Sequence, residues 1–279
     1  MIFELKPNLD TCWDHYGIRV KTNSAGFRAE RDYLIPKPAG TVRIVGLGDS
    51  FTFGFGVEYE QTWGHLLEQR LSARLGRPVE FINTGVGGYN TVNEVALLVD
   101  RGLELDPDLI ILFWCGNDVG APQFLLEPKS YSSLRSSALI DLVMARVARI
   151  EFQPRDLIPA AAEIRDAEVF PEQVPAEFRS LVGKRAVLRA FDELARISAR
   201  RQLPVVVAAE GFSMLFSTNH EFMDYLRDRG FIPVEILPTD PKYRISPSDL
   251  HLSAAGNELA ADVLDRTIQL ANLLGTRQP

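Results

Sequence analysis

Ser50 lies in a glycine-bounded turn, Gly48-Asp49-Ser50-Phe51, that directly follows the apolar run Val42–Leu47. The run predicts a strand, and the turn would place the serine at the carboxyl edge of a sheet, where open α/β folds bind their ligands. A serine hydroxyl becomes an effective nucleophile at neutral pH when a base lies beside it. His251, just before the last predicted helix, can supply that base. Taken alone, the stretch could also be an ordinary strand–loop connection.

Two more loops follow apolar, strand-like runs. One comes after Val79–Ile82 and contains Gly88, and the other, Gly116-Asn117-Asp118, comes after Leu109–Trp114. Three strand–loop units separated by helical patterns indicate a parallel sheet. Because crossover connections are right-handed, all three loops are expected at one edge of that sheet. The sequence therefore predicts that Ser50 meets the other two loops in space.

The remaining periodicity extends the α/β pattern. Apolar residues at helical spacing predict a helix that opens at Thr62 and stops at Gly76. Residues 1–40 are polar and end in a proline- and glycine-rich turn, so we expect an irregular arm packed on a domain that spans residues 41–279. The other expected elements are helices at 92–103, 184–201 and 219–228, strands at 204–209 and 231–236, a loop at 246–251, and a last helix from Ser253 to about Leu274.

The pattern loosens between about residues 119 and 183, where prolines alternate with short helical pieces such as 138–150. We interpret this stretch as a cap-like insertion and not as an independent domain. A long insertion at the ligand edge commonly shapes access to a site. A solvated excursion without function is the alternative, and the residues alone do not decide between them.

Composition limits the function classes. Hydrophobic residues make up 46% and charged residues 24% of the 279, which is ordinary for a soluble globular protein. The net charge of −7 and the lack of a dense basic run argue against a nucleic-acid partner. Two cysteines imply no disulfide framework. Because neither a signal-peptide pattern nor an apolar run of about 18 residues is present, we expect a cytoplasmic protein without a membrane span. The oligomeric state stays open.

Four blocks together resemble the GDSL, or SGNH, hydrolase family. They are Gly48-Asp49-Ser50-Phe51, the loop ending at Gly88, Gly116-Asn117-Asp118 and Asp249-Leu250-His251. Each block is weak alone, but four in the family's order form a strong signal over residues 41–265. The resemblance implies a three-layer flavodoxin-like sandwich with a five-stranded parallel sheet. It also implies hydrolysis of an ester or thioester through an acyl-enzyme, without a metal or an organic cofactor.

The family's serine falls on Ser50, its glycine on Gly88, its asparagine on Asn117 and its histidine on His251. Physical chemistry agrees with these roles. His251 can activate the hydroxyl, and a nearby carboxylate would orient the imidazole. The Ser50 N–H, the Gly88 N–H and the Asn117 amide are suitable donors to the oxyanion of a tetrahedral intermediate.

The acid departs from the family's pattern. The family most often has it three residues before the histidine, where this chain has Ser248, and Asp249 lies only two before His251. Asp249 is the favoured acid. The alternative is a Ser50–His251 pair helped by a carbonyl group or by a distant acid such as Asp240.

Two other functions compete with hydrolysis. An acyltransferase would use the same acyl-enzyme with an alcohol in place of water, and a binding protein would carry a degenerate site. The remaining histidines, His15, His65 and His220, show no metal-ligand spacing and are assigned structural or surface roles. The chain has neither a Gly-x-Ser-x-Gly elbow nor a phosphate-binding Gly-x-x-x-x-Gly-Lys motif. The substrate cannot be read from the sequence.

Overall fold

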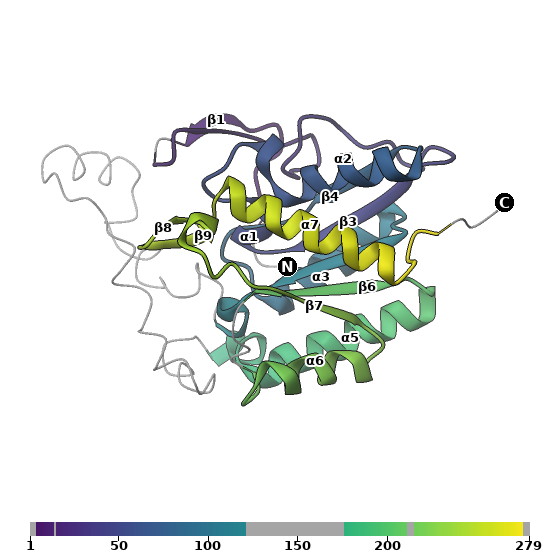
Figure 1. Ribbon diagram of the computed structural model, residues 1–279. Helices are drawn as coiled ribbons and strands as arrows, with labels where there is room; N and C mark the ends of the chain where they lie inside the picture. The colour runs from purple at the N-terminus through teal and green to yellow at the C-terminus, as the bar shows by residue number, and fades with distance from the viewer. Residues whose placement is uncertain (1–3, 14, 121–175, 211–214, 276–279) are drawn as a thin grey trace, which may run out of the picture.

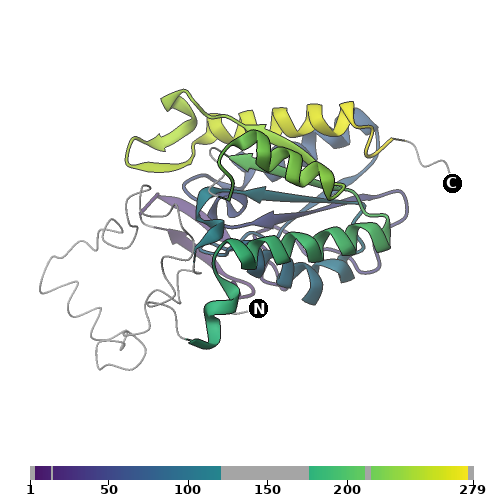
Figure 2. The same ribbon diagram turned by 90° about the horizontal axis from the view of Figure 1, so that it is seen from below.

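A computed structural model describes residues 4–13, 15–120, 176–210 and 215–275. Its centre is a parallel five-stranded sheet with the strand order β4-β3-β5-β6-β7. Helices cover both faces, so the molecule has three layers (Figures 1 and 2). The strands are β3 (Val42–Gly48), β4 (Val79–Asn83), β5 (Leu109–Trp114), β6 (Val205–Glu210) and β7 (Ile232–Ile236).

Burial on both faces explains why the strands read as continuous apolar runs. In β5, Leu109, Ile111 and Phe113 join the core beneath one helical layer. The alternate residues Ile110, Leu112 and Trp114 join the core beneath the other. All six are fully buried. This alternation is the ordinary period of two of a strand, and here both faces of the sheet are buried.

One helical layer contains α2 (Trp63–Leu75) and α7 (Ala254–Leu270). The other contains α3 (Thr91–Asp100), α5 (Lys184–Arg201) and α6 (Asn219–Asp228). Thr62 caps the start of α2 through the amide of His65, and Gly76 closes its end with a left-handed backbone. These are the two residues at which the sequence predicts the helix to start and stop.

Short elements complete the described chain. They are the strands β1 (Asp10–Trp13), β2 (Ile18–Lys21), β8 (Arg244–Ser246) and β9 (Asp249–Leu252), the helix α1 (Ser50–Phe53), and the 3₁₀ turns η1 (Tyr59–Gln61), η2 (Gly102–Leu105), η3 (Gly116–Val119), η7 (Ala176–Leu181) and η8 (Pro241–Tyr243). Within the described ranges, no helix has both the length and the apolar character needed to cross a membrane.

Four expectations from sequence are wrong in detail. The last helix ends at Leu270 and not at about Leu274. The predicted helix at 92–103 ends at Asp100 and gives way to the turn η2, because Gly102 interrupts it. The predicted loop at 246–251 forms part of the antiparallel pair β8–β9. The arm expected to be irregular contains the antiparallel hairpin β1–β2. The division into an arm and a domain stays a prediction, and nearly all of the proposed insertion lies outside the described residues.

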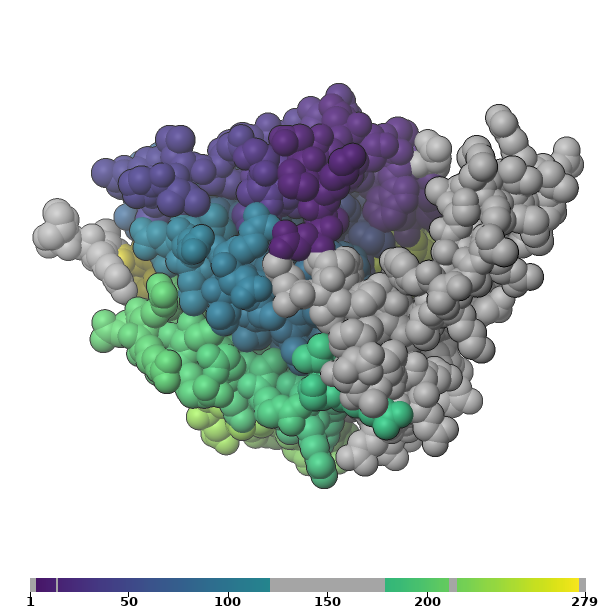
Figure 3. Space-filling view, turned by 180° about the vertical axis from the view of Figure 1, so that it is seen from behind, coloured from purple at the N-terminus to yellow at the C-terminus, as the bar shows by residue number. Residues whose placement is uncertain are grey.

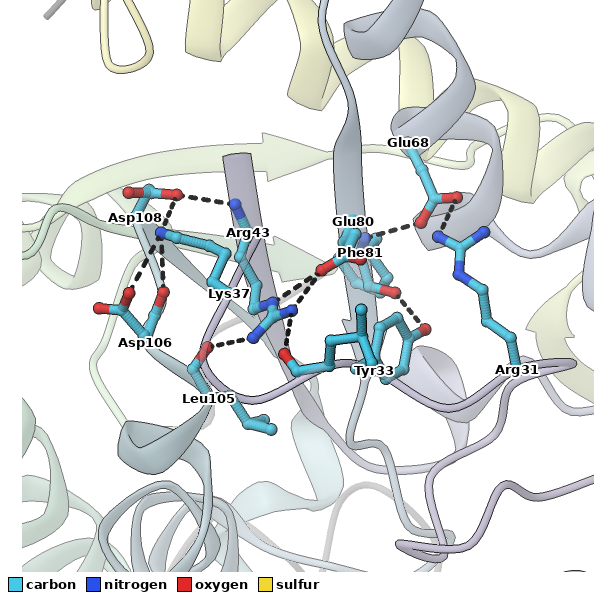
Figure 4. Close-up of polar contacts among 11 residues, drawn as sticks. Arg31, Tyr33, Lys37, Arg43, Glu68, Glu80, Phe81, Leu105, Asp106 and Asp108 are labelled. Atoms are coloured by element: carbon cyan, nitrogen blue, oxygen red, sulfur yellow. Dashed lines mark hydrogen bonds and ion pairs between the residues drawn. The ribbon is translucent and has the colours of Figure 1, made fainter. Parts of the chain in front are cut away.

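The first forty residues make specific contacts with the rest of the chain. Arg101 pairs with Glu4 at 2.7 Å and lies over the ring of Phe27, which joins the start of the chain to the end of α3. In Figure 3, the purple atoms of the start of the chain lie against the blue part of the molecule. On the edge strand β4, the Phe81 amide donates to Glu68, and the Phe81 carbonyl accepts from Tyr33 (Figure 4). An exposed edge strand can pair with strands of other chains, so these contacts also protect the edge of the sheet.

Candidate active site

Ser50 stands where the sequence places it, at the carboxyl end of β3 and the start of the short helix α1. The Asp49 carboxylate accepts from the Phe51 amide at 2.9 Å and so caps α1. Ser50 as a whole is only 6% exposed. Its hydroxyl oxygen lies 2.9 Å from His251 Nε2 and 3.2 Å from an Asp49 oxygen. The nucleophile candidate therefore has an imidazole within hydrogen-bonding distance, as general-base activation requires.

His251 is held from its other side by Asp249. The distance from His251 Nδ1 to Asp249 Oδ1 is 2.7 Å, and the His251 amide donates to the same oxygen at 3.1 Å. Burial favours the protonated form of Asp249, but hydrogen bonds from His251 and from Tyr16 outweigh it and hold the pKa of this carboxyl below its ordinary value. The three side chains thus form a continuous chain from carboxylate to imidazole to hydroxyl.

The secondary structure explains why a spacing of two residues suffices. Asp249 and His251 are the first and third residues of β9. In a strand, residues two apart point to the same side, so the carboxylate and the imidazole lie together. A loop, as predicted from sequence, would not have guaranteed this. The pairing of β9 with β8 is therefore what keeps the shifted acid within reach of the histidine.

The other candidate acid is bonded elsewhere. Asp240 accepts from the Lys242 amide at 3.0 Å, where it caps η8, and pairs with the Lys242 ammonium at 3.4 Å. Ser248, at the family's usual acid position, lies 3.2 Å from the hydroxyl of Ser246. Of the acids considered from sequence, the structure brings Asp249 to His251.

Two aromatic rings flank His251. The ring of Phe51 lies 5.3 Å from the imidazole, and the ring of Phe55 lies 5.1 Å from it, both measured between centroids. The contacts come from opposite ends of α1, one just inside it and one just after it. They restrict the tilt of the imidazole and give it an apolar setting beside the nucleophile.

The glycine loop after β4 packs tightly on the turn that carries Ser50. The Val86 amide donates to the Gly48 carbonyl at 3.2 Å. A side chain at Gly85 would place its Cβ 2.3 Å from the Phe53 nitrogen, so only glycine permits this approach. Gly88 has a left-handed backbone, with φ of +79°. The loop thus reaches the carboxyl edge beside Ser50, as the topology predicts, and its use as an oxyanion donor stays a prediction.

Asn117 reaches the same place from the end of β5. Its side-chain nitrogen donates to Asp49 Oδ2 at 2.7 Å, and its oxygen accepts from the Cys115 thiol. These two contacts fix which end of the amide carries the N–H groups. An amide nitrogen has two hydrogens, so one can hold Asp49 while the second serves an oxyanion. The contact with Cys115 was not foreseen.

A buried acid lies under this loop. Asp118 is 0% exposed, and its carboxylate accepts from the Cys115 amide at 2.7 Å. Glu94, on α3, is 1% exposed, and among the described residues no amide or hydroxyl donor reaches its oxygens. Burial, reinforced by the nearby charges of Asp118 and Asp49, raises the pKa of Glu94 well above its ordinary value. The raised pKa favours the protonated, neutral form of Glu94 in this buried position.

The three other histidines lie apart from this chain of contacts. His65 bonds with Gln69 on the surface of α2, and His220 pairs with Asp224 at 3.3 Å along α6. His15 packs edge-on against Tyr16. In the described part of the chain, no group of three or more histidine, cysteine or acidic side chains is arranged to hold a metal ion.

Comparisons with known proteins agree with this arrangement. A family model described as the GDSL-like Lipase/Acylhydrolase family matches residues 47–259, which include all four sequence blocks. No curated protein matches the sequence.

Among solved structures, the chain is similar to a protein assigned to the lipolytic proteins of the G-D-S-L family from Desulfitobacterium hafniense DCB-2. The identity is 13%, the TM-score is 0.50, and the match covers 81% of this chain and 99% of that one. It is also similar, at 16% identity and a TM-score of 0.50, to a two-domain esterase active on acetylated mannans. That match covers 86% of this chain and 52% of the esterase, so the chain spans about half of that protein. These likenesses concern the fold.

Proposed function

Because the chain belongs to the GDSL-like lipase/acylhydrolase family, we propose that it is a serine hydrolase that cleaves an ester or thioester through an acyl-enzyme on Ser50. The observation that carries the proposal is the unbroken contact from Asp249 through His251 to Ser50, with distances of 2.7 and 2.9 Å. The contact between Ser50 and His251 is short enough for the proton transfer that acyl transfer needs, and the contact between His251 and Asp249 is short enough to orient the imidazole.

In the first half-reaction, the Ser50 oxygen attacks the substrate carbonyl while His251 Nε2 takes the hydroxyl proton. Asp249 stabilises the imidazolium that forms. Collapse of the tetrahedral intermediate breaks the bond to the leaving group, which takes the proton from His251. In the second half-reaction, water attacks the acyl carbon and gives a proton to His251. The bond from the acyl carbon to the Ser50 oxygen then breaks, and His251 returns the proton to that oxygen, which releases the acid and free Ser50.

The negative charge of the intermediate needs donors in fixed positions. We assign that role to the Ser50 N–H, the Gly88 N–H and the Asn117 side chain. Asn117 is the best supported of these, because Asp49 and Cys115 fix the direction of its amide. A donor of this kind is worth about 3–4 kcal/mol of transition-state stabilisation.

The test is hydrolysis of p-nitrophenyl esters of increasing acyl chain length by the wild type and by Ser50→Ala. An acetylated mannan belongs in the same panel, since one protein with this fold acts on it. We expect turnover of at least one ester by the wild type and its loss in the variant. Equal turnover by both proteins would contradict the proposal. Added alcohols, with the products separated, distinguish water from an alcohol as the acceptor of the acyl group.

A further inference from the structure

Tyr16 lies between β1 and β2, in a part of the chain that precedes the family match at 47–259. Its hydroxyl donates to Asp249 Oδ2 at 2.8 Å, across 233 positions of sequence. The other carboxylate oxygen, Oδ1, is the one that contacts His251. We propose that Tyr16 is a positioning residue of the active site, which holds the Asp249 carboxylate in the orientation that supports His251. The inference rests on the proposed function of this site.

Asp249 needs a second anchor because of how it holds the histidine. The amide and the ring Nδ1 of His251 both contact the same oxygen, Oδ1, so these contacts hold only one of the two carboxylate oxygens. The torsion that turns an aspartate carboxylate is broad and weakly restrained by its own geometry. A donor on Oδ2 fixes that torsion. Tyr16 supplies it from outside β9, the strand that carries the other two groups.

The hydroxyl remains a donor over the working range of pH. Burial, together with the hydrogen bond to Asp249 and its negative charge, raises the pKa of Tyr16 above its ordinary value. The titratable groups that act on Asp249 are His251 and Tyr16, and the one that acts on Tyr16 is Asp249. His15 packs edge-on against the Tyr16 ring at 4.6 Å between centroids.

The tyrosine ring is held in place by its surroundings. It lies edge-on to Trp13 at 5.3 Å between centroids. Gly56 has a left-handed backbone, and a Cβ there would come within 3.3 Å of the Tyr16 ring and 2.0 Å of Ile245, so the absence of a side chain makes room for both.

The hairpin that carries Tyr16 is itself anchored beside the nucleophile. Ile18 and Val20 are buried with Phe53 in one small core, and the Arg19 amide donates to the Glu58 carboxylate at 3.1 Å. Farther along, Arg28 is 0% exposed and its guanidinium donates to the carbonyls of Phe53, Gly54 and Val57 at 2.6–2.7 Å. The start of the chain thus supports both the turn after Ser50 and the acid behind His251.

The experiment compares Tyr16→Phe with Tyr33→Phe. Tyr33 is the matched control, because it loses a hydroxyl that donates to the Phe81 carbonyl on the edge strand β4 and not to a residue of the site. Both variants are measured for kcat and KM on p-nitrophenyl acetate across the pH range and for thermal stability. In Tyr16→Phe, kcat should fall about tenfold with KM nearly unchanged, by the scale of a hydrogen bond to a charged group. The acid limb of its kcat profile should move to higher pH, since Asp249 loses a donor and becomes a more basic partner for His251. Tyr33→Phe should retain the wild-type kcat and profile.

A second background separates positioning from a general weakening of the fold. If Tyr16 acts through Asp249, adding Tyr16→Phe to Asp249→Asn should cause no further loss of kcat. Wild-type kcat and pH profile in Tyr16→Phe, or an equal further loss in the double variant, would overturn the inference. A wild type that hydrolyses no ester would count against the proposed function instead. In that case the low-field proton resonance of His251 Nδ1 still reports its bond to Asp249. We expect that resonance to weaken in Tyr16→Phe, and an unchanged resonance would overturn the inference.

Discussion

The two ends of the central sheet differ in whether their buried charged groups have partners of opposite charge. At the amino end, Arg43 of β3 is fully buried, and its guanidinium donates to Glu80 and to the carbonyls of Leu105 and Leu34 (Figure 4). Nearby, Lys37 pairs with Asp108 at 2.6 Å, and the same carboxylate accepts from the Arg43 amide. Each of these charges meets an opposite charge or a carbonyl dipole.

At the carboxyl end, the buried acids Asp49, Asp118 and Glu94 have no cationic partner among the described residues. Asp49 accepts from an amide and a thiol, Asp118 accepts from an amide, and burial raises the pKa of Glu94. Uncompensated buried carboxyls cost stability, and natural proteins tolerate such a cost chiefly at functional sites. The contrast indicates that the amino end serves the fold and the carboxyl end serves the chemistry. Substitutions at the two ends should therefore affect different measurements.

The largest effect is expected for Ser50→Ala. Loss of the nucleophile should lower kcat by roughly 10⁴-fold or more, with little change in the free energy of unfolding. Ser72→Ala is the matched control, because its hydroxyl accepts from the Val79 amide near the amino end and takes no part in the site. Hydrolysis by Ser50→Ala at the rate of Ser72→Ala would remove Ser50 from the mechanism.

Asp249→Asn should cause the second-largest loss of kcat. The carboxamide can hold the wrong tautomer of His251, so kcat should fall by up to about 10⁴-fold. Asp240→Asn changes an acid that caps η8, and it should leave kcat unchanged. Near-wild-type kcat in Asp249→Asn would leave a Ser50–His251 dyad, contrary to the geometry described above.

Glu80→Ala tests the amino end. It leaves the Arg43 guanidinium buried without its carboxylate, which should cost about 3–5 kcal/mol of unfolding free energy in a denaturant titration. Because the site lies at the opposite end, kcat of the folded variant should match the wild type. Glu258→Ala breaks an ion pair with Arg70, in which the Glu258 side chain is 56% exposed, and should cost no more than about 1 kcal/mol. A loss of kcat without a loss of stability in Glu80→Ala would remove the distinction between the two ends.

Asn117→Ala tests whether a residue at the carboxyl end stabilises the oxyanion. Loss of one donor should lower kcat about 10²–10³-fold with little change in KM. Steady-state kinetics on one activated ester separates the two parameters. If KM rises at constant kcat, Asn117 binds substrate and does not stabilise the transition state.

The smallest expected effect is a change in how stability depends on pH. The pKa of Glu94 is raised above its ordinary value of 4.5, so the folded state keeps a proton that the unfolded chain releases. Its contribution to stability is thus complete below about pH 4.5 and is lost as pH rises toward the folded pKa, by up to about 1.4 kcal/mol per pH unit. Glu94→Gln, whose amide can donate to Asp118, should flatten the unfolding free energy between about pH 5 and 8. An unchanged slope, equal to that of the exposed control Glu258→Gln, would show that Glu94 is ionised in the folded protein.

The parallel sheet was predictable because its strands are buried on both faces and read as apolar runs ending at glycine loops. That pattern located Ser50, Gly88 and Asn117 at one edge, and the later segment with His251 followed from the family resemblance. The contact between Asp249 and His251 could not be predicted from the spacing alone, because residues two apart lie on the same side only in an extended strand. The short segments β8 and β9 carry weak local signals, and their pairing depends on the fold around them.

Contacts made by the start of the chain could not be inferred in this way. Nothing near Tyr16 in sequence marks it as a partner of Asp249, because the contact depends on how the β1–β2 hairpin lies against the domain. The burial of Glu94 could not be inferred for the same reason. An acid on an amphipathic helix normally faces solvent, and only the folded structure shows that this one faces a loop of the site.

Covalent labelling with a fluorophosphonate probe, followed by mass spectrometry of the peptides, tests most directly whether Ser50 is an activated nucleophile. This measurement needs no knowledge of the substrate, since it reports an activated serine directly. We expect a single adduct on Ser50 in the wild type, slower labelling in Asp249→Asn and no adduct in Ser50→Ala. An adduct on another residue, or labelling of Ser50→Ala at the wild-type rate, would contradict the claim that the carboxyl end of the sheet is the active site.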